Sequence, residues 1–322
     1  MQIIIWIAIL IASLFFLIKS ADYFTEYSER IGLLFGMSSF IIGATIVAIG
    51  TSLPELVSSL FALQAGETTF VVDNIIGSNI ANALLILGIS GIAAKTLRIN
   101  TSLIDVDLPF FFMSMALFGY FALDSVISFP EGIALLIFFV IFVIYNIRQK
   151  PEEQDEDEMQ ELADKQEDIS ERKKKITKYT ILVIISIGIL SVSAKYLIDS
   201  ILTLSDLLEI SSSTLTITVV AFGTSLPEIL TSVAAVKRGN HGMAVGNVLG
   251  SNTFNLLLIA GIPALITPLT INPTTFAIGL PFLVIATFVA IFVTFDNKVK
   301  PWEGIAMLLF YAVFIAKIIG IM

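Results

Sequence analysis

The chain has no cysteine and a single histidine among its 322 residues. Without cysteine, disulfides, thiolate metal sites, iron–sulfur clusters and cysteine nucleophiles are excluded. His241 is the only imidazole, which excludes most zinc, haem and serine–histidine chemistry. Charge is scarce too, because only 14% of residues are charged, whereas 56% are hydrophobic and the mean hydropathy is +0.93. These values are typical of a polytopic membrane protein.

The net charge of −9 is concentrated in one place. Eleven of the 27 acidic residues lie in the polar segment 149–176, whose basic tail is Arg172-Lys173-Lys174-Lys175. We interpret this segment as a solvated linker, partly helical through acid–base pairs, because it lacks the ligand spacing and turn glycine of an EF-hand loop. A regulatory cation sensor or a membrane-surface switch is the alternative. The overall charge therefore indicates no particular partner, and no nucleic-acid partner is expected.

Apolar runs of about 20 residues, the length that crosses a bilayer, occur ten times. They lie at 2–18, 37–64, 71–94, 105–123, 130–147, 177–197, 212–236, 244–267, 274–295 and 302–321. We interpret the first run as a retained span rather than a signal peptide, because no basic segment precedes it. The mixed segments 19–35 and 198–211 are predicted to be short interfacial helices or loops.

The predicted spans indicate three units and one orientation. The units are a five-helix repeat at 1–148, the charged linker 149–176 and a second five-helix repeat at 177–322. Basic residues accumulate on cytoplasmic loops, and nearly all lysines and arginines fall on one side when the N-terminus is outside. We therefore expect a multi-pass protein of the cell membrane, functional as a monomer, with both termini extracellular and the linker cytoplasmic.

One motif occurs twice. Gly50-Thr51-Ser52-Leu53-Pro54-Glu55 returns 173 positions later as Gly223-Thr224-Ser225-Leu226-Pro227-Glu228. Residues 43–89 and 216–262 align without a gap, and about half of the positions are identical. Five spans per repeat is an odd number, so the second repeat must enter the membrane from the opposite side. The predicted fold class is an all-α membrane protein of ten helices, built as two inverted repeats whose helices break at the midplane.

Each motif places polar groups where charge is expensive. Pro54 and Pro227 displace the carbonyls of Gly50 and Gly223, so carbonyls around Ala48 and Ala221 become candidate cation ligands. Helical spacing of four puts Thr51 and Glu55 on one face, and likewise Ser78 and Asn82, and Ser251 and Asn255. Gly77, Gly88, Gly250 and Gly261 are interpreted as sites of close helix packing.

Together the two copies supply carboxylates, hydroxyls, amides and carbonyls. An all-oxygen set of this kind suits a hard cation, while softer transition metals prefer imidazole or sulfur. Two glutamate charges match one Ca²⁺, several Na⁺ or protons. Structural roles are the alternative: a polar-core pair for the glutamates, and helix packing for the serines and threonines.

At these residues the sequence resembles the cation/calcium exchanger superfamily, and within it the sodium/calcium exchanger branch. The two Gly-Thr-Ser-Leu-Pro-Glu copies and the two Gly-Ser-Asn-x-x-Asn copies, at 77–82 and 250–255, are similar to that family's alpha repeats. The resemblance implies that Ca²⁺ and Na⁺ are transported without a cofactor, several Na⁺ against one Ca²⁺. It implies that Glu55 and Glu228 bind both ions with Thr51, Thr224 and the carbonyls of Ala48 and Ala221. It also implies that Ser52, Ser225, Ser78 and Ser251 line flanking Na⁺ sites, with Asn82 and Asn255 near the centre.

The sequence departs from some relatives at Asn82 and Asn255, where those relatives carry an acid. Potassium-dependent members use that acid in the second repeat, so two asparagines favour K⁺-independent exchange. The alternatives are an H⁺-coupled or other divalent-cation antiporter on the same scaffold, an intramembrane hydrolase with Ser52 or Ser225 as nucleophile, and a cation channel. No enzymatic activity is expected, because the hydrolase lacks a histidine or lysine base at membrane depth.

Overall fold

The computed structural model describes residues 2–35, 50, 52–98, 107–148, 169–237, 239 and 241–322. Within these ranges the chain is nearly all helical, with four two-residue strands. In the first half lie α1 (Gln2–Leu34), α4 (Leu53–Gln64), α5 (Thr68–Ile80), η2 (Ala81–Ile86), α6 (Leu87–Ala93), β1 (Leu97–Arg98), α8 (Asp107–Phe121), η3 (Ala122–Asp124), β2 (Val126–Ile127) and α9 (Phe129–Arg148). In the second lie α11 (Ile169–Leu208), α12 (Ser212–Leu215), η4 (Thr216–Val220), α13 (Ala221–Thr224), α14 (Leu226–Lys237), α15 (His241–Phe254), η5 (Asn255–Ile259), α16 (Ala260–Ile266), β3 (Leu269–Thr270), η6 (Thr275–Gly279), α17 (Leu280–Thr294), β4 (Lys298–Val299) and α18 (Pro301–Ile318).

Seven helical stretches in the described part of the chain are long and apolar enough to cross a membrane. They are Gln2–Gly32, Thr68–Ala93, Arg172–Leu208, Ser212–Lys237, His241–Ile266, Thr275–Thr294 and Pro301–Ile318. Two shorter apolar helices, Leu108–Asp124 and Phe129–Tyr145, add to them. Nine predicted spans overlap these helices. Of the predicted span 37–64, the structure describes only residue 50 and residues 52–64, where α4 lies.

The prediction of separate interfacial segments at 19–35 and 198–211 is wrong. Both stretches are largely helical continuations of the preceding span, which makes α1 33 residues long and α11 40 residues long. Charged residues of the α1 extension pair at helical spacing, as Arg30 does with Glu26 at 2.7 Å. Such pairs support a helix outside the apolar region, so mixed polarity alone did not end it.

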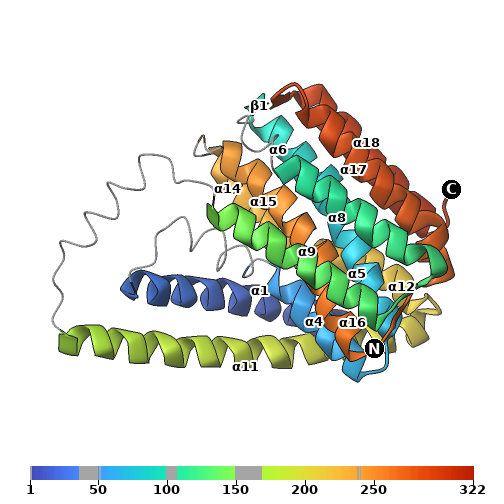
Figure 1. Cartoon of the computed structure of the whole chain (residues 1–322). Helices are drawn as coiled ribbons and strands as arrows, with labels where there is room; N and C mark the ends of the chain where they lie inside the picture. The colour runs from blue at the N-terminus through green and yellow to red at the C-terminus, as the bar shows by residue number, and fades with distance from the viewer. Residues whose placement is uncertain are drawn as a thin grey trace.

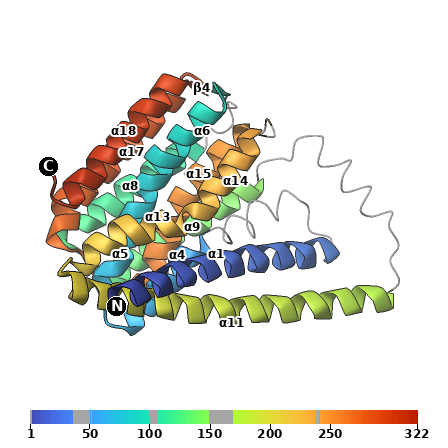
Figure 2. The same cartoon turned by 180° about the vertical axis from the view of Figure 1, so that it is seen from behind.

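The α1 and α11 helices lie side by side and antiparallel, and they extend beyond the other helices (Figures 1 and 2). The rings of Tyr27 and Tyr179 stack with their centroids 6.0 Å apart. The guanidinium of Arg30 lies 5.6 Å from the centre of the Tyr179 ring, and Arg172 donates to the carbonyl of Leu34. These contacts tie the two helices together where no other long helix covers them.

The core is formed by the helical stretches 68–93 and 241–266. In their most apolar windows 83% and 72% of the residues are buried, compared with 22% in α18. Buried residues here include polar ones, among them Asn74, Ser78 and Asn252. Polar groups inside a membrane protein face neighbouring helices rather than lipid, so these two stretches are where a functional site is expected.

Elements of the first half pack against elements of the second half at several points, and these contacts occur in matching pairs. Strand β1, which follows α6, pairs antiparallel with β4, which precedes α18. Strand β3, which follows α16, pairs with β2, which precedes α9. Helices of the two halves also pack closely against each other. A Cβ on Gly88 of α6 would lie 2.9 Å from the carbonyl oxygen of Gly304 in α18, and a Cβ on Gly132 of α9 would lie 3.1 Å from the carbonyl oxygen of Gly261 in α16. Each of these contacts between the halves thus has a counterpart in which the halves are interchanged.

Candidate functional site

The second motif interrupts a membrane helix at Ser225. Helix α13 ends at Thr224 and α14 begins at Leu226, with Ser225 in a turn between them. Pro227, in the first turn of α14, has no N–H to donate to the carbonyl of Gly223. The N–H of Ser225 still donates to the carbonyl of Ala221 at 3.2 Å. The break therefore leaves backbone oxygens at membrane depth that need another partner.

The first motif has the same local form where it is described. Ser52 directly precedes α4, which carries Pro54 in its first turn, and the Ser52 carbonyl accepts from the N–H of Leu56 at 3.2 Å. The hydroxyl of Ser52 makes no cap hydrogen bond. Of the predicted site residues, Thr51 and Ala48 lie outside the described residues.

Glu55 and Glu228 lie in the first turns of α4 and α14. Both are 1% exposed, and a helix N-terminus is the end of a helix at which negative charge is stabilised. The Oε2 atom of Glu55 is buried and has no hydrogen-bond partner among the residues that the structure describes. The hydroxyl of Ser251 donates to Oε1 of Glu228 at 3.5 Å. Both glutamates are thus carboxylates buried inside the protein rather than exposed at its surface.

Two contacts connect the motifs of the two halves. The hydroxyl of Thr224 lies beside the carboxylate of Glu55, and it donates to the carbonyl of Val220 at 3.1 Å. The hydroxyl of Ser78, on α5, donates to the carbonyl of Ala221 in a long hydrogen bond of 3.5 Å. Residues about 140 to 170 positions apart are thereby brought to one place.

Asn82 and Asn255 lie at the beginnings of two π-helical segments. Asn82 is the second residue of η2 and Asn255 the first of η5. Their Oδ1 atoms are buried and have no hydrogen-bond partner within the described ranges. Wider π turns are often found at functional sites, and the sequence prediction of continuous helices missed both. No residue pattern at these positions distinguishes a π turn from an α turn.

Several buried oxygens near the two breaks have no hydrogen-bond partner among the residues that the structure describes. Besides the atoms already named, the hydroxyls of Ser52 and Ser225 are buried and unpaired with respect to the described residues. Buried polar atoms are nearly always paired in folded proteins, so each exception needs an explanation. Hydroxyl, amide and carboxylate oxygens are the ligands that a hard cation prefers, so these atoms fit a cation-binding site.

Two further polar pairs belong to the same region. Asn247 donates from Nδ2 to the carbonyl of Glu228 at 3.3 Å and to the hydroxyl of Ser232 at 3.0 Å. Their counterparts under the shift of 173 positions are Asn74 and Ser59, both buried. Sequence analysis did not select these residues, although the gap-free alignment of the two repeats contains both matches.

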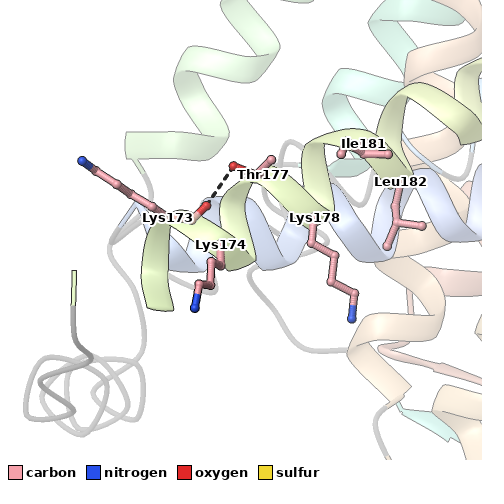
Figure 3. Close-up of a pocket in the computed structure, with 6 residues that line it drawn as sticks. All are labelled: Lys173, Lys174, Thr177, Lys178, Ile181 and Leu182. Carbon is pink, nitrogen blue, oxygen red and sulfur yellow. Dashed lines mark hydrogen bonds between the residues drawn. The ribbon is translucent and has the colours of Figure 1, made fainter. Parts of the chain in front are cut away.

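A surface pocket near the start of α11 is lined, among the described residues, by lysines rather than by acidic side chains. It is lined by Lys173, Lys174, Thr177, Lys178, Ile181 and Leu182 (Figure 3). Thr177 donates to the carbonyl of Lys173 at 3.0 Å, and three of the described lining residues are lysines. Ammonium groups are not ligands for a hard cation, whereas oxygen atoms are, so we place the candidate site at the broken helices.

A family model described as "Sodium/calcium exchanger protein" matches residues 5–148 and 178–320. The chain belongs to the sodium/calcium exchanger family. Both halves of the chain match this exchanger family, and the residues between the two matched stretches are those of the charged linker. The chain is therefore a multi-pass membrane transporter rather than an enzyme.

Individual exchangers and related proteins match nearly the whole chain. Inner membrane protein YrbG of Escherichia coli is 30% identical over 94% of this chain and 92% of its own length. Sodium/calcium exchanger MaX1 of Methanosarcina acetivorans is 29% identical, with 95% and 96% covered. A structure of the sodium-calcium exchanger NCX_Mj, soaked with Na⁺ and Sr²⁺, matches with a TM-score of 0.67 and 30% identity, covering 97% of both chains.

Proposed function

We propose that the protein is a secondary active antiporter that exchanges Na⁺ for Ca²⁺ by alternating access, electrogenically and without K⁺. The observation that carries the proposal is the pair of contacts between the halves, Glu55 with Thr224 and Ser78 with Ala221. They join carboxylate, hydroxyl and carbonyl oxygens from both motifs around one buried region. Sodium/calcium exchange by MaX1 and NCX_Mj, as their names state, supports the choice of ions.

The proposed ligands fall into two groups. Glu55 and Glu228 hold Ca²⁺ or Na⁺ at the centre with Thr51, Thr224 and the carbonyls of Ala48 and Ala221. Ser52, Ser225, Ser78 and Ser251 line flanking Na⁺ sites, and Asn82 and Asn255 lie near the centre. Two carboxylates balance one Ca²⁺, and the neutral donors complete the six to eight oxygens that this ion prefers.

The proposed architecture is ten membrane helices in two inverted five-helix repeats, 1–148 and 177–322. The matching pairs of contacts between the halves support this architecture. Strand β1 pairs with β4 and β3 with β2, and Gly88 packs against Gly304 as Gly261 packs against Gly132. A two-fold axis in the membrane plane generates paired contacts of this kind.

The orientation follows from the positions of the basic residues. We place both termini outside the cell and the linker 149–176 in the cytoplasm, and we propose that a single copy is sufficient, because both motifs of the site are in one chain. Asn255 carries no charge, which supports K⁺-independent exchange.

Obligatory exchange follows from electrostatics. An empty site with two buried carboxylates is costly to rearrange within the membrane, whereas a site filled by Ca²⁺ or by Na⁺ is neutralised. The protein therefore crosses between outward-facing and inward-facing states when it is loaded. Electrogenic transport results when the Na⁺ charge moved per cycle exceeds two.

The decisive experiment is isotope flux in proteoliposomes with Na⁺, K⁺ and pH gradients varied independently. We expect ⁴⁵Ca²⁺ uptake that requires an outward Na⁺ gradient, is indifferent to K⁺ and responds to membrane potential. Uptake that persists without Na⁺ but disappears when the pH gradient is collapsed would assign an H⁺-coupled antiporter instead. Flux without any counter-ion would indicate a channel.

A further inference from the structure

Asp73 is a third buried acid, outside the proposed exchange site. Among the acidic side chains that the structure describes, only Glu55, Asp73 and Glu228 are buried, and Asp73 is 0% exposed. It lies on α5, five residues before Ser78. In the aligned repeats its counterpart is Gly246, so this carboxylate exists in one half only.

The surroundings of Asp73 are oxygen atoms from three elements. Its Oδ1 accepts a 2.5 Å hydrogen bond from the hydroxyl of Thr275, in η6. The hydroxyl of Ser213, in α12, also lies beside the carboxylate. Glu67, directly before α5, is close enough to interact with it electrostatically. This carboxylate therefore has hydroxyl groups and a second acid as its neighbours.

The two oxygens of the Asp73 carboxylate differ in their hydrogen bonding to the described residues. Oδ2 of Asp73 is buried and accepts no hydrogen bond from any residue that the structure describes. The ion pairs found within the described ranges are at Lys19–Asp22, Glu26–Arg30 and Lys300–Glu303, and Asp73 is in none of them. A buried carboxylate without a positive neighbour is costly, and a bound cation would remove that cost.

The position of Asp73 relates it to one face of the membrane. Five residues of helix separate it from Ser78, a rise of about 7.5 Å along α5. It lies toward the end of α5 where Thr68 contacts Thr270 through a 2.6 Å hydrogen bond between hydroxyls. In the proposed orientation this is the extracellular end.

We propose that Asp73, Ser213 and Thr275 form an outer cation site that takes one Na⁺ on the extracellular side of the exchange site. The inference rests on the proposed function. Glu67 is only partly buried, so Asp73 is the one fully buried carboxylate of this cluster. One monovalent ion neutralises it, and three protein side chains are too few for the six to eight ligands of Ca²⁺. Because Gly246 replaces the acid in the second half, the inner side has no equivalent. The exchanger therefore loads Na⁺ with different affinities from its two faces.

The first test compares the two faces. ²²Na⁺ uptake is measured in right-side-out and inside-out vesicles carrying Asp73→Asn, which keeps the shape of the side chain and one oxygen that can accept from Thr275. We expect the ratio of outer to inner Na⁺ half-saturation to rise several-fold. A ratio equal to that of the wild type would overturn the proposal.

A matched variant separates ion binding from packing. Thr275→Val removes the hydrogen bond to Asp73 but keeps the negative charge. An ion site predicts a smaller change in the ratio for Thr275→Val than for Asp73→Asn. A purely structural tether predicts equal changes, or a larger one for Thr275→Val, and either result would contradict the proposal.

The second test needs no transport, so its outcome is independent of whether the exchange mechanism is right. In the double variant Glu55→Gln, Glu228→Gln, purified in detergent, thermal unfolding is followed in NaCl and in choline chloride. We expect a rise in melting temperature with Na⁺ that disappears when Asp73→Asn is added. Equal melting temperatures in the two salts would exclude the outer site and leave the proposed exchange untouched. If the double variant does not fold, the flux comparison of Asp73→Asn decides.

Discussion

Asn247 and Asn74 occupy equivalent positions in the two halves, yet among the described residues only the side chain of Asn247 has hydrogen-bond partners. Its Nδ2 donates to the carbonyl of Glu228 and to the hydroxyl of Ser232. Both side-chain polar atoms of Asn74 are buried without a hydrogen-bond partner in the described part of the chain. Under the proposed alternating access, the two inverted halves exchange conformations during the cycle. Equivalent residues are then expected to differ in their contacts in any one conformer.

This asymmetry predicts opposite effects for two alanine variants. Asn247→Ala removes two hydrogen bonds present in this conformer, worth about 1–3 kcal/mol together, and shifts the equilibrium toward the other. Asn74→Ala should destabilise that other conformer, in which Asn74 takes the paired role. Apparent Ca²⁺ affinity measured from each face of the membrane should therefore change in opposite directions for the two variants. Changes in the same direction for both variants would show that these asparagines do not set the balance between outward-facing and inward-facing conformers.

Glu55→Gln and Glu228→Gln should each reduce exchange at least about 100-fold. Either substitution keeps the side-chain volume and removes one of the two negative charges proposed to hold the cation. Breaking a buried ion pair, here that of the carboxylate with the cation, typically costs about 3–5 kcal/mol. ⁴⁵Ca²⁺ uptake driven by a Na⁺ gradient measures the effect. Glu209→Gln, the same change at an exposed glutamate, is the control and should transport normally. Normal transport by either site variant would remove that glutamate from the proposed site.

Much of the fold could be predicted from hydropathy and the repeat. Nine of the ten predicted spans overlap the long or apolar helices of the described chain, and the described end of the tenth, 53–64, is helix α4. Hydropathy suffices because lipid-facing and core helices are both continuously apolar. The ends of α1 and α11 could not be predicted, since their polar extensions are supported by contacts between distant residues such as Tyr27 and Tyr179. Gly250 was expected to allow close packing, but a Cβ there would meet no atom within 4 Å, because a glycine in a sequence does not reveal what faces it.

Part of the candidate site could be selected from the sequence because its residues recur in both repeats. The shift of 173 positions selects Glu55, Glu228 and their neighbours without any knowledge of the fold. The π turns at Asn82 and Asn255 could not be foreseen, because π turns have no residue signature. The contact of Asp73 with Thr275 could not be predicted either, because 202 positions separate the two residues and Asp73 has no counterpart in the second repeat.

Asn255→Asp should change the dependence of exchange on monovalent ions. The Oδ1 atom of Asn255 is buried and unpaired among the described residues, so an acid there adds a third charge near the proposed centre. That charge attracts K⁺ or a proton, and uptake should become sensitive to K⁺ or shift its pH profile. Flux measured with K⁺ and pH varied separately distinguishes the two. Asn297→Asp, at an exposed turn, is the control, and an unchanged ion profile for Asn255→Asp would move Asn255 away from the centre.

Gly304→Ala should destabilise the protein by about 1–3 kcal/mol, the usual cost of overpacking. A Cβ at Gly304 in α18 would lie 2.5 Å from the backbone carbonyl oxygen of Gly88 in α6, so the helices must separate. Thermal unfolding in detergent measures the loss. Gly188→Ala, on α11, is the matched control: a Cβ there meets nothing within 4 Å, and alanine is the better helix former, so its melting temperature should hold or rise. A Gly304→Ala protein as stable as the control would mean that α6 and α18 do not pack this closely in the membrane protein.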